Sequence, residues 1–369
     1  MNFILLCGFA FLFLASIPYI IFILGIKFGH KPTPIHPLQT LPNFTMIISA
    51  YNEEGSIEAR IKNLIDCKIP KDVWELILID DCSIDDTLVK AVEHLSRSNI
   101  NFTLISNKTR LGKTTSVNNA IAISKYPIII TTDCDVYFEK DAINYILRRL
   151  ESDPSIAAVC GELQPYKNKN NTTQLESSYR DYYGKMCDWE SAVDSTYNFN
   201  GALIAFRKSA LKSINAHSGA DDANTAFEVI RGGYRAVYEN RAVVYEDIPE
   251  KFSVQYKQKI RRAKQLIDTT ISNIDIIKQN RPFSRIFYPL RFFMYVCAPL
   301  ITFVALGLIL VGLYLFNPVI LLIMLTLYIM FSCLLSKNIV NAFLINQFYL
   351  LAGLVKIGKD MSGWETTRR

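Results

Sequence analysis

Two carboxylates separated by one residue, Asp133 and Asp135, directly follow an apolar run at residues 128–132. Pro127 excludes a helix just before this run, and the β-branched residues in it predict a buried strand. Residues at positions i and i+2 of an extended chain point to the same side, and ligands bind beyond the carboxyl ends of strands in open α/β sheets. The pair therefore predicts a site for Mg²⁺ or Mn²⁺, which could in turn hold a diphosphate. An exposed turn after a strand is the competing interpretation.

Polar side chains follow two further predicted strands in the same way. They are Tyr51, Asn52 and Glu53 after the strand at 46–49, and Asp80 and Asp81 after the strand at 76–79. Ligand-binding groups gather at the carboxyl ends of parallel strands, so we expect these side chains to lie near Asp133. Three such coincidences favour a binding site over three unrelated turns.

Lys113 lies in the segment Leu-Gly-Lys-Thr-Thr, which invites comparison with a phosphate-binding loop. That motif needs a glycine at position 107, where Asn107 stands, so the pattern does not support a P-loop. A lysine that meets phosphate as a point charge and a solvated loop lysine both remain open. Asp221 and Asp222 begin a predicted helix, where acidic residues can also be a simple response to the helix dipole.

The order of the predicted elements indicates the fold class. Strands are predicted at 46–49, 76–79, 102–105 and 128–132, with helices starting near 56 and 87 and within 112–124. This alternation predicts an α/β fold with a mostly parallel sheet and helices on both faces. Further along come a strand at 157–161, a polar loop at 165–173, an aromatic-rich helix at 175–189, a strand at 199–206 and a basic helix from about 251.

The composition excludes an ordinary soluble enzyme. The 369 residues are 50% hydrophobic with a mean hydropathy of +0.17, and the apolar excess lies at the two ends of the chain. The eight cysteines form no CxxC pair and have no histidine nearby, so we expect reduced thiols facing the cytosol. A net charge of +6 is modest and is attributed mostly to the flanks of membrane segments, and no nucleic-acid partner is expected.

Residues 2–26 carry no charge and are long enough to cross a bilayer, which takes about 20 residues. Because Lys27 and Lys31 follow this run, the domain after it is expected in the cytosol. A cleaved signal peptide is the rival interpretation, and the lack of a basic segment before the run weakens it. Spans are also predicted at 292–316 and 319–335.

The last apolar stretch, 339–355, contains Asn341, Asn346 and Gln347 and is followed by a basic tail with Lys359 and Arg369. A spanning helix there would place the tail outside, against the positive-inside tendency, so an interfacial or re-entrant helix is expected. The predicted organisation is a transmembrane helix at 1–27, a linker at 28–44, a cytosolic domain at 45–285 and a membrane region at 286–369.

Several motifs together resemble family 2 glycosyltransferases, especially the membrane-integrated cellulose, chitin, hyaluronan and poly-N-acetylglucosamine synthases. They are SAYNEE at 49–54, IDDCSIDDT at 79–87, RLGKTTSVNNA at 110–120, TTDCDV at 131–136, FNGALIAFRKSAL at 199–211, ADDANTAFEVIRGGYRAVY at 220–238 and GWETTRR at 363–369. The resemblance implies a GT-A, Rossmann-like domain that binds a nucleotide sugar, flanked by transmembrane helices.

The resemblance also implies roles for the residues that match these motifs. Tyr51, Asn52, Glu53, Asp80 and Asp81 would hold the nucleoside, Lys113 the diphosphate, Asp133 the sugar and ribose, and Asp133 with Asp135 the Mg²⁺ or Mn²⁺ ion. Asp222 falls at the position of the catalytic base, which takes a proton from the acceptor hydroxyl. Asp221, Gln258, Arg261 and Arg262 would lie on the acceptor and diphosphate side.

Two departures from the family pattern concern the acceptor. The polymer synthases carry Q-x-x-R-W, but Arg262 stands here in place of the tryptophan that would stack on an acceptor sugar. An arginine can instead bind an anion, such as a lipid-linked phosphate or an acidic sugar. The usual Thr-Glu-Asp is Ala-Asp-Asp at 220–222. Processive polymer synthesis therefore does not follow from the resemblance.

The sequence predicts an inverting glycosyltransferase of the cell membrane, with several spans, a cytosolic catalytic domain and the C-terminus also in the cytosol. A UDP-sugar is favoured as donor, the acceptor is lipid-linked or a saccharide, membrane lipid is a further partner, and a homo-oligomer is possible. Transfer of a single sugar to a polyprenyl-phosphate carrier and a non-catalytic, membrane-anchored nucleotide-binding protein stay open as alternatives.

Overall fold

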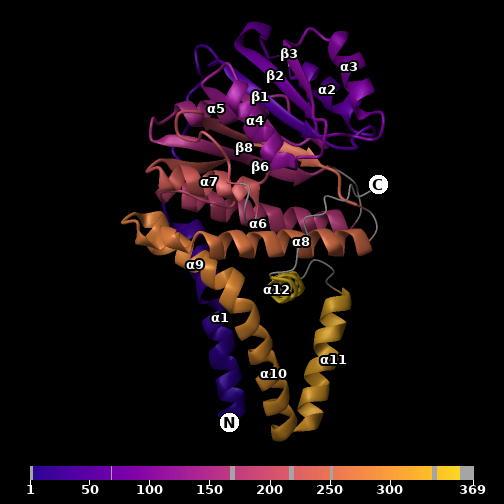
Figure 1. Ribbon diagram of the computed structural model, residues 1–369. Helices are drawn as coiled ribbons and strands as arrows, with labels where there is room; N and C mark the ends of the chain where they lie inside the picture. The colour runs from indigo at the N-terminus through magenta and orange to yellow at the C-terminus, as the bar shows by residue number, and fades with distance from the viewer. Residues whose placement is uncertain are drawn as a thin grey trace.

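The computed structural model describes residues 3–67, 69–166, 171–215, 220–249, 252–334 and 339–357. An α/β domain forms one end of the molecule and a group of apolar helices the other (Figure 1). The predicted basic tail from residue 358 onward, with its GWETTRR motif, lies outside the described residues.

The α/β domain is built on an eight-stranded sheet among the described residues, in the order β3-β2-β1-β4-β7-β6-β8-β5. The strands are β1 (Phe44–Ala50), β2 (Trp74–Asp80), β3 (Phe102–Ser106), β4 (Ile128–Thr132), β5 (Val136–Phe138), β6 (Ile156–Pro165), β7 (Ile204–Arg207) and β8 (Arg235–Glu246). β3, β2, β1 and β4 are parallel neighbours and β6 pairs in parallel with β8, whereas β7 and β5 are antiparallel to their neighbours. The prediction of an α/β fold with a mostly parallel sheet is confirmed.

Helices cover both faces of the sheet, as the alternation predicted. The helices of the domain are α2 (Ile57–Asp66), α3 (Thr87–Ser96), α4 (Lys113–Ile123), α5 (Ala142–Glu151), α6 (Asn171–Val193), α7 (Asp221–Arg231) and α8 (Phe252–Ser272). Apolar residues of α2, α3 and α5 pack in one buried cluster, and those of α4, α6, α7 and α8 pack in a second cluster on the opposite face. β4 is buried along its whole length, because it has neighbours on both sides and helices above and below.

Three details of the sheet differ from the expectation, and one of them is β8 (Arg235–Glu246), where no strand was predicted. The strand predicted at 199–206 begins only at Ile204, because Asn200 turns the chain: its amide donates to Gly161 O at 2.9 Å and its Oδ1 accepts from Ala202 N at 3.2 Å. The short strand β5 was not predicted, because three residues are too few for a visible alternation.

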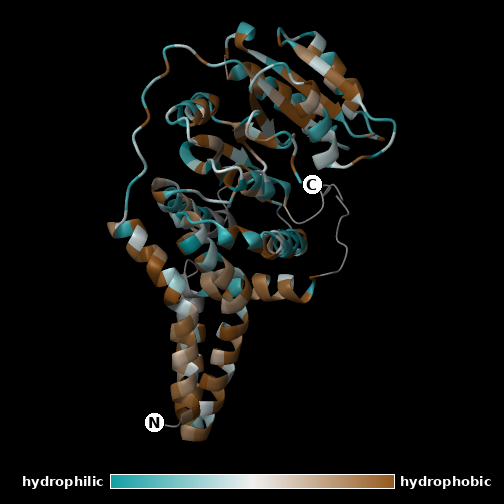
Figure 2. Ribbon diagram, turned by 60° about the vertical axis from the view of Figure 1, so that its left-hand side comes forward, coloured by the Kyte–Doolittle hydropathy of each residue, from teal (hydrophilic) through white to brown (hydrophobic). Residues whose placement is uncertain are grey.

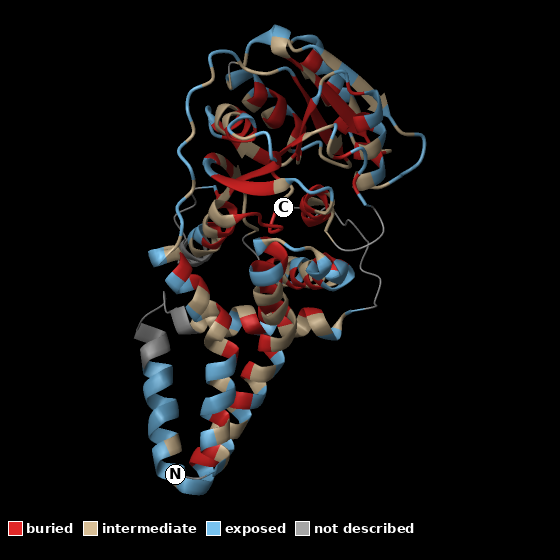
Figure 3. Cartoon of the chain, turned by 90° about the vertical axis from the view of Figure 1, so that its left-hand side faces the viewer, coloured by how far each residue is buried: buried red, intermediate tan, exposed pale blue. Residues whose placement is uncertain are grey.

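The apolar helices are α1 (Phe3–Phe28), the continuous segment Phe283–Phe316 that includes α9 (Tyr288–Phe292) and α10 (Ala298–Phe316), α11 (Pro318–Leu334) and α12 (Ile339–Val355). α1 and the segment Phe283–Phe316 are each long and apolar enough to cross a membrane; α11 and α12 are shorter. α1, α10 and α11 form the brown stem in Figure 2, and much of α11 is exposed in Figure 3.

α12 lies across the directions of α1, α10 and α11 and is seen end-on in Figure 1. It packs beneath α8, where a Cβ on Gly353 would lie 3.0 Å from Lys264 N. The fully buried Gln347 donates to Tyr19 Oη of α1 at 2.6 Å. This crosswise direction is compatible with the predicted interfacial helix, which stays a prediction.

Candidate functional site

The polar groups predicted to meet at one sheet edge all follow parallel strands. In the β1–β2 pair Ala50 lies opposite Asp80, and in the β1–β4 pair Ile48 lies opposite Thr132. The residues that follow these strands therefore emerge at the same edge, which is the usual ligand-binding edge of an open α/β sheet.

Asp81 holds the loop that precedes α4. Its Oδ1 accepts from Leu111 N at 2.9 Å and from Ser116 Oγ at 3.0 Å, and its Oδ2 accepts from Gly112 N at 2.8 Å. Burial alone would raise the pKa of Asp81, but these hydrogen bonds and one from Asn107 outweigh it and lower that pKa. Both Asp80 and Asp81 are 2% exposed, and their observed contacts fix the conformation of the loops. A contact of Asp81 with the nucleobase of a donor stays a prediction.

The loop after β1 is joined to the loop after β2. Asn52 adopts a φ of 55°, its Oδ1 accepts from Ile84 N at 3.0 Å, and its own N–H donates to Ser83 Oγ at 3.0 Å. Glu53 N donates to the Thr87 hydroxyl at 2.7 Å. Asparagine tolerates this left-handed conformation better than most residues, so the segment fixes the position of its neighbour Tyr51.

The ring of Tyr51 faces the guanidinium of Arg110, with 3.9 Å between the guanidinium carbon and the ring centroid. Arg110 comes from the same loop that Asp81 holds. An aromatic ring and a guanidinium both offer flat faces on which a nucleobase can stack. The pair therefore extends the predicted nucleoside side of the site.

Lys113, the first residue of α4, lies at the centre of the site. Its Nζ is 2.5 Å from Asp133 Oδ1 and 3.9 Å from Asp221 Oδ2. Although burial opposes the charge, the two carboxylates raise the pKa of Lys113, which stays protonated. A cation held between carboxylates at a strand end is suited to meet the phosphates of a ligand.

Gly201 borders this pair from the turn that replaces the predicted strand. A Cβ at Gly201 would lie 3.0 Å from Lys113 Nζ and 3.2 Å from Asp133 Oδ2. Any side chain would therefore press on the ion pair. The motif FNGALIAF already contained Gly201, but only the structure indicates why a glycine stands at this position.

Asp222 lies at the start of α7, half-buried beside these groups. Burial and the neighbouring charge of Asp221 raise the pKa of Asp222 to about 7, although Lys113 acts in the opposite direction. Its Oδ1 accepts from Ala223 N at 2.8 Å. A carboxylate with a pKa near neutrality is suited to take up a proton during a reaction.

The metal expected at Asp133 and Asp135 can be tested against the chemistry of these residues. Among the described residues, no group of three or more His, Cys, Asp and Glu side chains could hold an ion alone. Mg²⁺, however, is commonly bound by one or two carboxylates together with phosphates of the substrate. Cys134 between the two is 4% exposed and points into the core. The two carboxylates fit an ion that binds together with a diphosphate.

α8 brings three predicted residues towards the site from the side of the apolar helices. The pKa of Arg261 is lowered by burial and by Arg262, whereas the charge of Asp133 raises it. Arg261 is therefore close enough to Asp133 to interact with it. Arg262 donates to Glu246 Oε2 at 3.1 Å and is half exposed. Gln258 lies one helical turn before Arg261 and completes this face of α8.

Three tyrosines near this face were missed by the sequence reasoning. The ring centroids of Tyr137 and Tyr166 are 5.5 Å apart, and those of Tyr166 and Tyr245 are 6.0 Å apart. Tyr137 follows Asp135 by two residues, and its Cα is paired with that of Tyr245. The signal was present in the Val-Tyr-Phe sequence after Asp135, but the contact depends on the pairing of β5 with β8.

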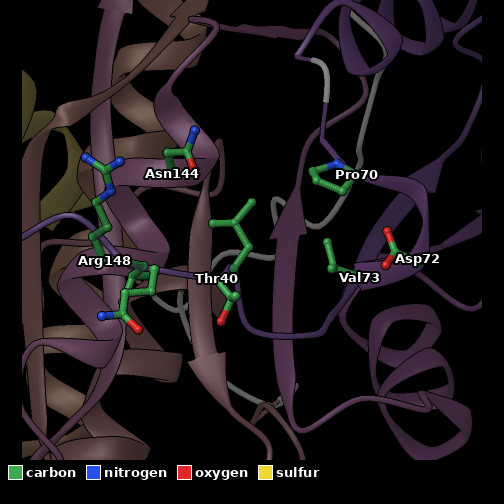
Figure 4. Close-up of a pocket in the computed structure, with 9 residues that line it drawn as sticks. Thr40, Pro70, Asp72, Val73, Asn144 and Arg148 are labelled. Atoms are coloured by element: carbon green, nitrogen blue, oxygen red, sulfur yellow. The ribbon is translucent and has the colours of Figure 1, made fainter.

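A separate hollow of about 390 Å³ lies at the opposite edge of the sheet, before the first residues of β1 and β2. Figure 4 shows its lining, which includes Thr40, Pro70, Asp72, Asn144 and Arg148. It contains none of the predicted site residues.

Residues 45–214 match the family described as Glycosyl transferase family 2. The chain is 23% identical over 250 residues to a poly-beta-1,6-N-acetyl-D-glucosamine synthase of Staphylococcus aureus strain MSSA476. The matched region covers 67% of this chain and 60% of that protein. A synthase of the same name from Staphylococcus epidermidis is 22% identical over 230 residues, covering 61% of this chain and 55% of that protein. The chain thus spans less than two thirds of the length of these relatives.

Among solved structures, a mannosyltransferase from Pyrobaculum calidifontis, in complex with GDP-Man and Mn²⁺, superimposes with a TM-score of 0.80. It is 24% identical, and the match covers 96% of this chain and 98% of that one. The likeness therefore extends over the apolar helices as well as the α/β domain, and it shows the fold.

Proposed function

We propose that this chain, whose residues 45–214 match the Glycosyl transferase family 2 model, is a glycosyltransferase that transfers a sugar from a nucleoside-diphosphate donor to a lipid-linked or saccharide acceptor. The observation that carries the proposal is the meeting of Lys113, Asp133 and Asp222 beside Gly201. This arrangement combines a cation for the leaving phosphate with a carboxylate that can take up a proton.

In the proposed reaction, Asp222 accepts the proton of an acceptor hydroxyl while the oxygen attacks the anomeric carbon of the sugar. The bond from that carbon to the diphosphate breaks, so a single displacement inverts the configuration. Lys113 and Arg261 face the leaving diphosphate and offset its growing negative charge. Asp133 and Asp135 would hold Mg²⁺ or Mn²⁺, which supplies Lewis-acid stabilisation of the leaving group when bound.

The donor nucleoside is assigned to the loops after β1 and β2, with Asp81 and the pair of Tyr51 and Arg110 beside the base. A UDP-sugar stays the favoured donor, since polymer synthases share the motifs. GDP-Man is the named alternative, because it is bound by the Pyrobaculum enzyme that matches over almost the whole chain. The choice between them is open to direct measurement.

The acceptor is assigned to the side of α8 that faces the membrane. Arg262 is half exposed and shares Glu246 with Arg180, so this side carries two guanidinium groups around one carboxylate. Guanidinium groups are suited to bind phosphate. We expect a polyprenyl-phosphate or another lipid-linked acceptor to bind there, approached from the cytosolic face of the membrane.

A non-catalytic nucleotide-binding protein is the alternative from another class. Such a protein would need the loops after β1 and β2 to bind the nucleotide. It would not need the carboxylate of Asp222, whose pKa is raised to about 7, next to the proposed diphosphate site. The experiment uses membranes containing the chain, incubated with UDP-GlcNAc, UDP-glucose or GDP-Man and analysed by mass spectrometry. We expect a glycosylated lipid or saccharide with one donor, lost in excess chelator and in Asp135→Ala; donor binding without any product would establish the alternative.

A further inference from the structure

Arg60 of α2 is fully buried directly behind residues 133–135, here called the carboxylate turn. Its Nη2 donates to Thr132 Oγ1 at 2.9 Å and its Nη1 to Val136 O at 3.2 Å. These two partners are the residues immediately before and after the carboxylate turn. One side chain thus bridges both ends of the turn.

The same helix fixes the strand that leaves the turn. Asn63 Oδ1 accepts from Phe138 N at 2.8 Å, and Asn63 Nδ2 donates to Phe138 O at 3.0 Å. Arg60 also donates to Asn63 Oδ1 at 2.9 Å, and its guanidinium carbon lies 4.0 Å from the centroid of the Phe138 ring. Arg60 and Asn63 therefore act together on the segment 132–138.

The buried charge of Arg60 is unusual for a side chain that only holds two backbone segments together. Among the described residues, no carboxylate forms an ion pair with it within 4.0 Å, and its Nε has no hydrogen-bond partner. Burial of an arginine with neutral partners costs stability, so a purely structural contact would be served better by a neutral side chain. Burial lowers the pKa of Arg60 to about 10, and the charges of Asp133 and Asp135 are among the groups that oppose this shift.

The three side chains of the carboxylate turn differ in burial. Cys134 is 4% exposed and packs in the buried cluster that contains the apolar residues of α2. Asp133 and Asp135 are half-buried, and Asp133 Oδ1 lies 2.5 Å from Lys113 Nζ in the site. The orientation of these carboxylates depends on the two bridged ends of the turn. The positive charge behind them also offsets their mutual repulsion when they are not neutralised from the front.

We propose that Arg60 is a positioning residue, which with Asn63 sets the carboxylate turn in the geometry that binds a divalent cation together with a nucleoside diphosphate. The inference rests on the proposed function, because it presupposes that Asp133 and Asp135 hold the ion. Groups behind metal ligands typically change metal affinity or activity by about 10- to 100-fold when substituted.

The test is a titration of Mn²⁺ followed by electron paramagnetic resonance, on the purified full chain in detergent with excess GDP or UDP. Arg60→Lys keeps the charge but loses the fork that bridges the turn, and Asn63→Ala removes the second contact. We expect the Mn²⁺ midpoint to rise about 10-fold in Arg60→Lys and to rise also in Asn63→Ala. Asn63→Ala keeps the test decisive if Arg60→Lys does not fold.

The matched control is Arg149→Lys in α5, which changes another buried arginine, one that is paired with Glu239 at 2.8 Å. Arg149→Lys should lower the melting temperature and leave the Mn²⁺ midpoint unchanged. If a general loss of rigidity were enough to weaken Mn²⁺ binding, the midpoint would rise in this variant too. Unchanged midpoints in Arg60→Lys and Asn63→Ala would overturn the proposal and leave the metal in the proposed function. Absence of Mn²⁺ binding by the unsubstituted chain with either nucleotide would remove the metal from the proposed function, and this inference with it.

Discussion

Asp222 is the residue on which the proposed chemistry depends. Its pKa is raised to about 7 by burial and by Asp221, so we expect transfer to decline as the pH falls below about 7. Asp222→Asn should lower transfer by about 10²–10⁴, on the order of 3–5 kcal/mol of barrier, with donor affinity within a few-fold of the unsubstituted chain. A pH–rate profile with a donor-binding assay measures both.

The control for this pH dependence is Glu162→Gln, because burial also raises the pKa of Glu162 to about 7. The decline at low pH should persist in Glu162→Gln if Asp222 is the base. The rival role of Asp222 is an interaction with the helix dipole, a contribution of about 0.3–1 kcal/mol to stability. Asp222 is the second residue of α7, after the N-cap Ala220, so near-normal transfer by Asp222→Asn would favour that role and point to Asp221 as the base.

The same pKa makes a prediction about stability. A carboxyl whose pKa is raised in the folded state binds its proton more tightly there than in the unfolded chain. The stability of the folded chain therefore falls as the pH rises from the ordinary pKa of an aspartate towards about 7. Asp222→Asn removes this cost and should melt at a higher temperature than the unsubstituted chain at pH 8, without metal or donor. An equal or lower melting temperature would argue that Asp222 is satisfied as a carboxylate.

Lys113 and the metal compete for Asp133. With Nζ 2.5 Å from Asp133 Oδ1, Lys113 neutralises the carboxylate that the ion would use. Lys113→Met should therefore bind Mn²⁺ alone more tightly, yet lose about 10- to 100-fold in kcat/KM for the donor, the usual cost of a lost hydrogen bond to a charged group. Paramagnetic titration without nucleotide and donor kinetics measure the two effects, and weaker Mn²⁺ binding alone would contradict the competition.

At the scale of residues, the sequence predicted which strand ends carry polar groups, because that depends only on local pattern. The convergence of Lys113, Asp133 and Asp222 followed from the motifs. The partners of Arg60 and the close contact at Gly201 could not be predicted, since each joins segments about 70 or more residues apart through a particular packing.

Among the elements, the contact between α6 and the helical segment Phe283–Phe316 ties the domain to the apolar stem. Arg291 Nε is 2.6 Å from Glu190 Oε1, and both side chains are 1% exposed. Arg291 also donates to Tyr295 Oη at 2.8 Å and lies 4.7 Å from the centroid of the Phe22 ring of α1. One arginine therefore joins α1, α6 and the segment that leads into α10.

Removal of one partner should destabilise this junction strongly, because it leaves the other charge buried. Arg291→Met is expected to lower the free energy of unfolding by about 3–5 kcal/mol, measured by denaturation in detergent. The control is Arg97→Met, which removes an exposed pair with Glu93 and should cost at most about 0.5 kcal/mol. Equal effects of the two substitutions would show that the buried pair carries no special weight.

The elements themselves were largely predictable where the apolar period is long. The strand at 128–132 and the helix starts at residues 87 and 221 agree with the structure. The pattern failed at 199–206, where apolar residues suggest a strand but the side chain of Asn200 satisfies the backbone locally. Such a turn competes with the sheet through hydrogen bonds that hydropathy does not record.

At the scale of the whole molecule, the direction of the helices makes a prediction about topology. The N-terminal end of α1 and the junction of α10 with α11 lie together at the end of the stem away from the α/β domain (Figure 1). Lys27 and Lys31 stand at the opposite end of α1, next to the domain. Positive residues favour the cytosolic side, so we expect the domain in the cytosol and the α10–α11 junction outside.

The topology is tested with an impermeant thiol reagent added to intact cells, measured against the labelling of the native cysteines in the unsubstituted chain. Val319→Cys lies at the junction, where Val319 is 61% exposed, and should be labelled from outside. Ser96→Cys, at an exposed position on α3, should be labelled only after the cells are permeabilised. The positive-inside tendency predicts one orientation, with the domain in the cytosol. Labelling of Ser96→Cys in intact cells would contradict it and place the domain outside. Cytosolic donors such as UDP-sugars and GDP-Man would then be out of reach, and the proposed transfer at the cytosolic face would fail with the topology.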